Sequence, residues 1–481
     1  MSPSATRTGS SQPGATPPRT LASTWREVME ATRGARRDYT SEPLGRAIFL
    51  LAVPMVLEMV MESLFAVADV FWVGRLGAPA VATVGLTETI MVLVYTVAMG
   101  LGVAATAVIA RRVGEGDRES ASRAAVQAII LGVVISGAMA AGGAVFAPRL
   151  LQLMGASPDV STTGTTFVRV MLGGSSSAFL LFVMNSSFRA AGDPSLSLRV
   201  LWLSNAINII LGPLLIFGVG PFPRLGLTGA AVGTTIGRGV GVLYATTKLV
   251  QGRGTLSLRW RHLGFEPRTM ARLLRLALNG TFQMLVGSLN WVALVRVVAA
   301  FGSVAMSGYT IAIRLVVFAL LTAWGLANAA ATLVGQSLGA RDAKRAEQSA
   351  WTAARYNAAF LAVTGAVYIV LARPIVSAFT SDPTVADVAV YGLRVISAGF
   401  PLFAFGMVLT QAFNGAGDTF TPTMINIGVF WLFEVPLALL LVARTPLQWR
   451  AVFIAVLAAY SLLAVVSAIV FRRSRWKKGR V

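Results

Sequence analysis

The chain has 481 residues, of which 55% are hydrophobic and only 13% are charged, and its mean hydropathy is +0.70. A soluble protein cannot bury so much apolar surface in its own cores, which excludes an ordinary soluble domain and requires a membrane. The formal net charge is +21, and the absence of cysteine excludes disulfides and thiolate metal sites.

The first 43 residues are rich in Ser, Thr, Pro and Arg and lack the central apolar run of a cleavable signal peptide. We expect a disordered cytoplasmic tail over 1–43. Residues 22–38 could instead form a short amphipathic helix on the membrane surface, but a solvated tail is favoured.

Twelve apolar segments follow, each long enough to cross about 30 Å of hydrocarbon as a helix. Gly, Pro or charge clusters separate them. Because unsatisfied backbone groups in lipid are costly and no strand pattern competes, all twelve are predicted to be helices. They are 44–73, 79–110, 122–147, 162–188, 194–219, 228–250, 269–298, 304–336, 346–371, 387–413, 419–443 and 448–471.

An offset of 225 residues aligns the two halves of the chain without net insertion. Pro158 then matches Pro383, and Arg169 matches Arg394. Rare residues that repeat at one offset indicate duplication. The sequence therefore predicts an all-α polytopic membrane protein with about twelve transmembrane helices in two parallel six-helix repeats. Such halves enclose a cleft and can rock about it to give alternating access.

The distribution of Lys and Arg orients this architecture, because most of the 41 fall in the termini and in alternate loops. The positive-inside rule then places both termini in the cytoplasm of a bacterial-type plasma membrane. The net charge thus reflects topology and not nucleic-acid binding. The expected domains are a first bundle at 44–250, a basic cytoplasmic linker at 251–268, a second bundle at 269–471 and a basic cytoplasmic tail at 472–481.

Three acidic residues share one stripe of the first helix: Glu58, Glu62 and Asp69. Charges at membrane depth persist only when they are paired, face water or serve function. The stripe is not duplicated, so we predict a role in ion or substrate handling, most strongly for Asp69. Alternatively, Glu58 and Glu62 pair with an embedded arginine. The candidates for that arginine are Arg238, Arg296 and Arg314, and the duplicated positions of the stripe are Gln283, Gly287 and Leu294.

Amide side chains on two later helices, Asn185, Asn205 and Asn208, could ligate a cation beside a carboxylate. Interhelical hydrogen bonding is the alternative, and for Asn205 it is favoured. Glu88 and Glu434 are isolated acids at membrane depth that could either serve a site or form a buried pair.

Other residues are candidates for the substrate cavity or for a hinge. Pro54 could bend the first helix, although a static kink is the alternative. Pro213, Pro401 and Pro436 also interrupt helices. The cavity candidates beyond Glu88 and Glu434 are Gln283, Met184 and Trp202, together with Phe179, Trp324 and Trp431. All of these except Gln283 could equally face lipid or pack in a core.

No enzymatic motif is present. The single histidine, His262, lies in a basic loop, which disfavours a Ser/His/Asp triad or a histidine-ligated metal. A membrane-embedded transferase would need paired carboxylates or a catalytic histidine, and neither is found. We expect a transporter, with no cofactor beyond its coupling ion.

At these residues the chain resembles the multidrug and toxic compound extrusion (MATE) transporters, particularly their DNA-damage-inducible-protein-F-like branch. The resemblance runs over nearly the whole chain after about residue 43. It depends on the order of several segments, which are AVPMVLEMVMESLFAVADVFWVGRLG at 52–77, GLGVAATAVIARRVGEGD at 100–117, FRAAGDP at 188–194, NIILGPLLI at 208–216, LGLTGAAVGT at 225–234, VGQSLGARD at 334–342 and FNGAGDT at 413–419.

The resemblance implies two bundles of six helices in a V and export of often cationic, amphiphilic compounds against entering protons or sodium ions. It implies that Asp69 is the cation-coupling aspartate, that Asn185 and Asn208 are its amide partners and that Thr234 matches a hydroxyl on the sixth helix. Sodium could bind at Asp69, Asn185 and Asn208. Many members have an aspartate where this chain has Gly212. Glu58 or Glu62 could compensate, and the missing carboxylate favours protons.

A lipid-linked oligosaccharide flippase of the same superfamily is the alternative. It should line its cleft with several basic residues to hold pyrophosphate. The candidates are Arg238, Arg296, Arg314 and Arg355, and the acids of the first half outweigh them. The expected partners are a small-molecule substrate and the lipid bilayer, with no nucleic acid, and the chain is expected to work as a monomer.

Overall fold

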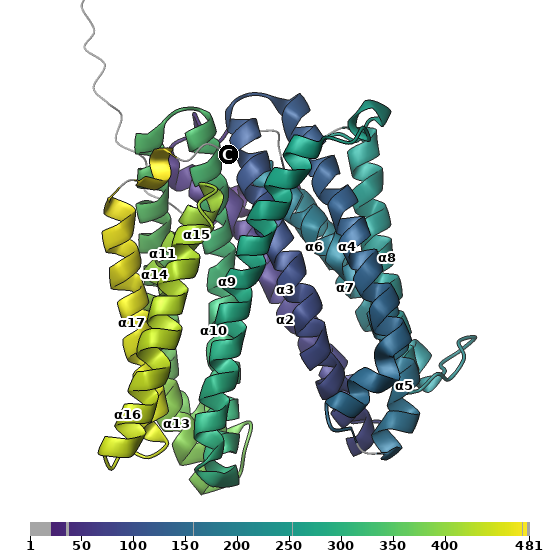
Figure 1. Ribbon diagram of the computed structural model, residues 1–481, viewed down its shortest axis with the longest axis vertical. Coiled ribbons are helices and arrows are strands. Elements are labelled where there is room, and N and C mark those ends of the chain that lie inside the picture. Colours follow the sequence, from purple (N-terminus) through teal and green to yellow (C-terminus); the bar gives the residue numbers. More distant parts are fainter. Residues whose placement is uncertain (1–20, 35–37, 157, 253, 474, 479–481) are drawn as a thin grey trace, which may run out of the picture.

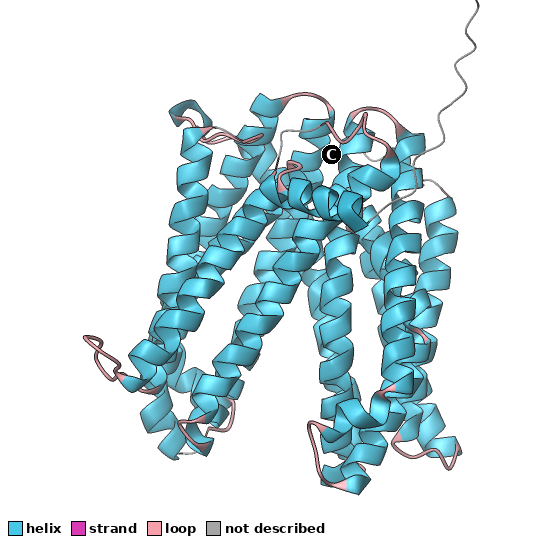
Figure 2. Ribbon diagram, turned by 180° about the vertical axis from the view of Figure 1, so that it is seen from behind, coloured by secondary structure: helices cyan, strands magenta, loops and turns pink. Residues whose placement is uncertain are grey.

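The computed structural model describes residues 21–34, 38–156, 158–252, 254–473 and 475–478, and over these ranges it contains helices and loops but no strand (Figure 2). A short helix, α1 (Leu21–Arg33), precedes the first half. That half contains α2 (Leu44–Gly74), α3 (Ala78–Gly114), α4 (Arg118–Leu153), α5 (Pro158–Gly173), α6 (Ser175–Ala190), α7 (Pro194–Phe217) and α8 (Leu227–Gln251).

The second half begins after a short helix in the linker, η1 (Trp260–His262). Its elements are α9 (Pro267–Ala299), α10 (Gly302–Gly339), α11 (Ala343–Val370), α12 (Ala372–Ser377), α13 (Pro383–Ala398), α14 (Phe400–Gly415), α15 (Phe420–Asn426), the π-helix η2 (Ile427–Glu434), α16 (Val435–Arg444) and α17 (Arg450–Arg472). A final turn, η3 (Arg475–Lys478), follows.

Ten helical stretches in the described part of the chain are long and apolar enough to cross a membrane, and the pair α13–α14, bent by 59°, makes an eleventh. The sixth predicted segment is also helical, as α8, but it contains Arg238, Lys248 and several Gly and Thr residues. The prediction of an all-α polytopic membrane protein is therefore confirmed.

The helices form two bundles that meet at the end where the C-terminus lies and diverge toward the opposite end, which carries α5, α13 and α16 (Figure 1). Two large buried clusters largely follow this division. The first draws mainly on α3–α8 and also includes Leu273 and Ala277 at the start of α9, and the second lies within α9–α17. The V expected from the family resemblance is confirmed.

The first helix of the chain's first half contacts both bundles. The beginning of α2 buries Ile48, Leu51 and Met55 in a cluster with Ala330 and Leu333 of α10, in the second half. Beyond Pro54, α2 packs along α7 of the first half. The helix therefore changes partners close to the one proline within it.

At the end where the bundles meet, glycines allow α3 and α10 to approach closely. A Cβ atom at Gly114 would overlap the carbonyl group of Gln336. The Gln336 side chain donates from Nε2 to the carbonyl oxygen of Ala190 at 3.0 Å, and Thr332 donates to that of Arg189 at 3.3 Å. The two halves are thus closed against each other at this end.

The duplicated aspartates are helix caps. Asp117 and Asp342 accept hydrogen bonds from the backbone three residues later, at 2.8 Å in each half. Asp193 and Asp418 do the same for α7 and α15. Since a side-chain acceptor at the N-cap satisfies an otherwise free N–H group, these repeats preserve the fold and not a binding site.

The prediction of disorder over 1–43 is wrong for Leu21–Arg33, which form α1. The amphipathic helix considered for 22–38 is present as far as Arg33. It packs on α2, because Ala31 is buried and Glu30 pairs with Arg46 at 3.0 Å. Residues 1–20 and 35–37 lie outside the described residues.

Candidate functional site

Two of the three acids on α2 are held by arginines. The buried Glu58 lies 2.5 Å from Nη1 of Arg189 at the end of α6 and accepts a hydrogen bond from Ser197 of α7 at 3.0 Å. Arg189 also donates to Ser186 at 2.9 Å. Because only 2% and 9% of these two side chains are exposed, their charges neutralise each other away from solvent.

Glu62, one helical turn later, pairs with Arg238 of α8 at 2.6 Å. Asn205 of α7 donates to the same carboxylate at 3.0 Å. The Arg238 guanidinium also lies over the ring of Phe65, 5.2 Å from its centroid. This pair ties three helices of the first half together, and Asn205 acts in an interhelical hydrogen bond, as favoured from sequence.

These pairs correspond to the alternative that the sequence left open for Glu58 and Glu62. Arg238 was among the expected arginines. Arg189 was not, because it follows the predicted segment 162–188, whereas the structure places it in α6 with 7% of its surface exposed. The acidic stripe is therefore two structural ion pairs followed by one carboxylate without a basic partner.

That third carboxylate, Asp69, is half-buried and has no hydrogen bond or ion pair among the described residues. It interacts electrostatically with Glu88 of α3. Glu88 is exposed, and it interacts in turn with Arg314 of α10, in the opposite half. Glu88 thus links Asp69 electrostatically to the second half.

The amide and hydroxyl residues implied by the family resemblance are buried in α6, α7 and α8. Asn208 donates from Nδ2 to Oγ1 of Thr234 at 2.7 Å. Asn185 is 2% exposed, and its Oδ1 has no partner. Among the described residues no hydrogen bond joins Asp69 to Asn185 or Asn208, so the structure brings together Asn208 and Thr234 but not a full set around Asp69.

Gly212 leaves room where many family members have an aspartate. A Cβ atom built there would lie 3.9 Å from Oδ1 of Asn208 and meet nothing nearer. Across the interface with α8, a Cβ atom at Gly233 would lie 3.3 Å from Cα of Gly212. Among the described residues, no other side chain fills the space beside Gly212.

A cavity of about 150 Å³ lies between the halves, near their closed end. Met59, Phe182 and Arg189 line it from the first half, and Trp324 and Gln411 line it from the second. Arg189 is the only charged residue in this lining, and it is already paired with Glu58.

A larger cavity, of about 290 Å³, lies within the second half. No charged residue lines it, whereas Trp291, Trp324 and Tyr460 do, together with the polar Gln283 and Asn426. Gln283 and Trp324, two of the residues selected from sequence, therefore border a cavity.

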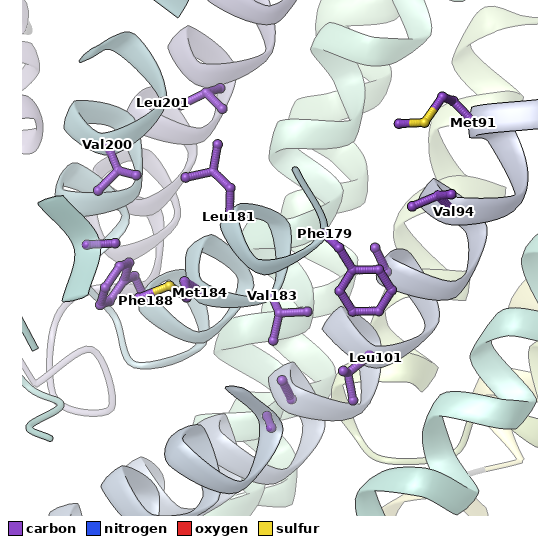
Figure 3. Close-up of a cluster of buried hydrophobic side chains, with 14 of the residues drawn as sticks. Met91, Val94, Leu101, Phe179, Leu181, Val183, Met184, Phe188, Val200 and Leu201 are labelled. Atoms are coloured by element: carbon purple, nitrogen blue, oxygen red, sulfur yellow. The ribbon is translucent and has the colours of Figure 1, made fainter. Parts of the chain in front are cut away.

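Other cavity candidates lie elsewhere. Met184 and Phe179 are buried in the hydrophobic core of the first half (Figure 3). Trp202 and Trp431 are partly exposed, and each donates its indole N–H to the first helix of its own half, at Leu57 and Val286 respectively. None of the four lines either of the two cavities described above, and the cavity role of Met184 and Trp202 stays a prediction.

Glu434, a further cavity candidate, is fully buried and borders neither of these two cavities. Sequence reasoning gave it even weight as a site or a pair. The structure gives it one hydrogen bond, from Asn290 at 2.9 Å, and no basic partner among the described residues.

The described residues contain no cluster of three or more His, Asp or Glu side chains that could hold a metal ion. His262 is buried and contacts Glu119 at 2.8 Å, which fastens the linker to α4.

Comparison with known proteins agrees with this geometry. The family model MatE matches residues 54–214 and 281–440, one segment in each half. A probable multidrug resistance protein NorM from Thermotoga maritima is 24% identical over 91% of this chain and 94% of its own length. An FAD transporter from Shewanella oneidensis is 24% identical over 84% of this chain and 90% of its own length.

Among solved structures, the chain is similar to a MOP superfamily transporter from Pyrococcus furiosus, with a TM-score of 0.86 and 25% identity over 92% of this chain and 98% of the other. A multidrug resistance MATE family transporter in an outward-facing conformation gives the same TM-score, identity and coverage.

Proposed function

Because this chain belongs to the multidrug and toxic compound extrusion (MatE) family, we propose that it exports small cationic or amphiphilic compounds in exchange for protons. It is a multi-pass membrane transporter and not an enzyme. The proposed transport is secondary active antiport by alternating access between the two halves.

One observation carries the proposal of cation coupling. Of the three acids on α2, Glu58 and Glu62 are neutralised by Arg189 and Arg238, whereas Asp69 has no partner among the described residues. An unpaired carboxylate at membrane depth is costly, and it is retained where it binds ions or substrate. Asp69 can therefore gain or lose a proton without breaking the ion pairs that hold the bundle together.

Protons are favoured over sodium as the coupling ion. Sodium needs several oxygen ligands around one position. Gly212 supplies none, and Asp69 has no hydrogen bond to Asn185 or Asn208 among the described residues. A single carboxylate suffices for a proton.

The movement that accompanies coupling is proposed to occur in α2. Its first part packs on the second half and its later part on the first half, and the change of partner lies near Pro54. Proline removes one backbone hydrogen bond from a helix and so eases bending. Protonation of Asp69 would remove charge from the face toward the second half, allow α2 to bend and displace the compound outward.

The closed end of the V is proposed to be cytoplasmic. Both described ends of the chain lie there, together with the basic linker, and basic residues accumulate on the cytoplasmic side of membrane proteins. In this orientation the protein is outward-facing, and we propose that it works as a monomer in a bacterial-type plasma membrane.

The test is transport of a cationic dye by the purified full chain in proteoliposomes, with proton and sodium gradients imposed separately. We expect the proton gradient to drive dye transport and the sodium gradient to have no effect. Transport under sodium alone, or under neither gradient, would contradict the proposal. Empty liposomes under each gradient give the background.

A second substrate class deserves the same assay, because the central cavity contains Arg189 as its only charged lining residue beside Trp324 and Phe182. The rings of Trp324 and Phe182 suit an aromatic compound, and one relative is an FAD transporter. Gradient-driven export of FAD, with no export of cationic dyes, would favour this class. A single paired arginine is less than the several free basic residues that a pyrophosphate-binding flippase requires.

A further inference from the structure

The second half contains an acid whose charge nothing neutralises. Glu434 has no exposed surface, and it accepts one hydrogen bond, from Asn290 Nδ2 to Oε2 at 2.9 Å. Its other oxygen, Oε1, has no partner, and neither has the hydroxyl of Tyr309, which is 2% exposed. Both Tyr309 and Tyr460 interact electrostatically with Glu434.

The first half provides an internal comparison. In each half, an acid and an amide join the first membrane-spanning helix of that half to the fifth, where α5 and α6 count as one span and α12–α14 as another. The pair is Glu62 with Asn205 between α2 and α7, and Asn290 with Glu434 between α9 and η2. The acid and the amide have exchanged helices. A tryptophan of the fifth helix also donates to a backbone carbonyl of the first helix in both halves.

The two pairs differ in what neutralises the acid. Arg238, from the last helix of the first half, lies 2.6 Å from Glu62. In the second half the last helix, α17, provides Tyr460 near Glu434, and Tyr460 carries no positive charge. The groups that face Glu434 are therefore Asn290 from α9, Tyr309 from α10 and Tyr460 from α17, with no Lys, Arg or His among the described residues.

The backbone at Glu434 is also unusual. Glu434 ends the π-helix η2, in which the N–H of Val435 bonds to the carbonyl of Phe430 instead of that of Trp431. Pro436 follows and cannot donate a hydrogen bond, so the regular α-helical pattern cannot continue through this point. Single π-turns of this kind occur frequently at functional sites.

We propose that Glu434 is a second proton-binding carboxyl group and that it holds a proton in the conformation seen here. An ionised carboxylate in an apolar interior without a cation is far costlier than a neutral one. A bound proton therefore neutralises Glu434, as Arg238 neutralises Glu62. The bound proton sits on a carboxyl oxygen and leaves to water as the carboxylate forms.

A release path lies on one side of the residue. Tyr460 and Trp291 line the 290 Å³ cavity of the second half, and Trp291 is adjacent in sequence to the Glu434 partner Asn290. Movement of α17 or η2 would extend this cavity to Glu434 and hydrate it. This part of the inference rests on the proposed proton antiport, in which each half would then carry one exchangeable proton.

Infrared spectroscopy of the purified full chain in lipid tests the proton directly, without any transport. The carbonyl band of protonated carboxyl groups should be present at neutral pH and weaker in Glu434→Gln. The matched control is Glu347→Gln, the same change at a carboxylate of the second half that is paired with Lys477 at 2.6 Å. It should leave the band unchanged. An identical band in wild type and Glu434→Gln would overturn the proposal.

A count of protons released when a cationic dye binds separates this inference from the proposed function. We expect Glu434→Gln and Asp69→Asn each to release fewer protons than wild type, and the double variant to release none. Full release by Glu434→Gln with reduced release by Asp69→Asn would overturn the inference and leave the antiport intact. If wild type releases no protons, the role of Glu434 in exchange is overturned together with the proposed function, and the infrared band decides whether it binds a proton.

Discussion

Membrane acids in this protein are distinguished by their partners and not by their depth. Glu58 and Glu62 have arginines, Asp69 is half-exposed and unpaired, and Glu434 is buried and unpaired. The first two therefore stabilise the bundle. The other two can change protonation without dismantling it, which makes them candidates for coupling.

The most consequential pair for stability should be Glu58 with Arg189. Arg189→Gln leaves the Glu58 carboxylate buried without a cation, and we expect a loss of roughly 3–5 kcal/mol in the free energy of unfolding. The measurement is thermal or denaturant unfolding of the detergent-solubilised chain. The matched control is Arg373→Gln, which breaks an exposed pair with Asp387. An equal loss of unfolding free energy in Arg189→Gln and Arg373→Gln would show that burial of the Glu58–Arg189 pair does not affect stability.

A second residue-scale prediction concerns the missing carboxylate. Gly212→Asp places an acid beside Oδ1 of Asn208, at a position where a Cβ atom meets no nearer group. We expect the variant to fold and to bind sodium more tightly than wild type, because a carboxylate joins the amide and hydroxyl oxygens of Asn208 and Thr234. Sodium-dependent thermal stabilisation measures this. Unchanged sodium dependence would show that these oxygens do not converge.

At this scale the sequence predicts the exceptional residue but not its surroundings. The stripe on α2 and its absence from the second half single out Asp69. The partner of Glu58 was missed, because the distance between α2 and α6 is set by packing and not by periodicity. Met184 packs in the hydrophobic core of the first half, and the sequence could not distinguish that environment from a cavity, because a methionine on a membrane helix suits both.

Among the elements, α2 is the one whose surroundings change along its length. Its beginning is buried against α10 and its later part against α7, with Pro54 near the change. The sequence identifies Pro54 as a candidate hinge. The contacts show that it lies between the part of α2 that packs on the second half and the part that packs on the first half. By contrast, α1 was not favoured from sequence, since a short polar helix depends on its packing against α2.

Pro54→Ala should therefore fold normally and transport more slowly. Alanine restores a backbone N–H and raises helix propensity, so α2 becomes stiffer. We expect reduced gradient-driven dye transport with unchanged dye affinity, measured on the same reconstituted protein. Pro148→Ala, at a proline within α4 of the first half, is the control. If both variants transport at the wild-type rate, Pro54 is only a static kink.

For the whole molecule, the repeat in sequence corresponds to two bundles closed at one end. The duplicated N-caps, such as Asp117 and Asp342, explain why the repeat can be detected in the sequence, because each half needs the same capping residues where its helices begin. The V itself was expected only through the family resemblance. Neither cavity could be located from sequence, since each is formed by residues far apart in the chain.

The two halves have similar helix arrangements but differ in where their acidic residues lie. In the first half Asp69 interacts electrostatically with Glu88, and Glu88 with Arg314 of the second half, whereas the second half encloses Glu434 without a basic partner among the described residues. Under the proposed mechanism, proton binding at these acids couples the relative movement of the two halves to ion entry.

The most direct test of that claim compares two modes of transport in Asp69→Asn. Reconstituted Asp69→Asn should still exchange labelled for unlabelled dye across the membrane, because exchange requires only binding and rocking. Its transport of dye against a concentration difference, under an imposed proton gradient, should fall well below the wild-type rate, because only the proton proposed for Glu434 remains exchangeable. Concentrative, proton-driven transport by Asp69→Asn at the wild-type rate would contradict the account.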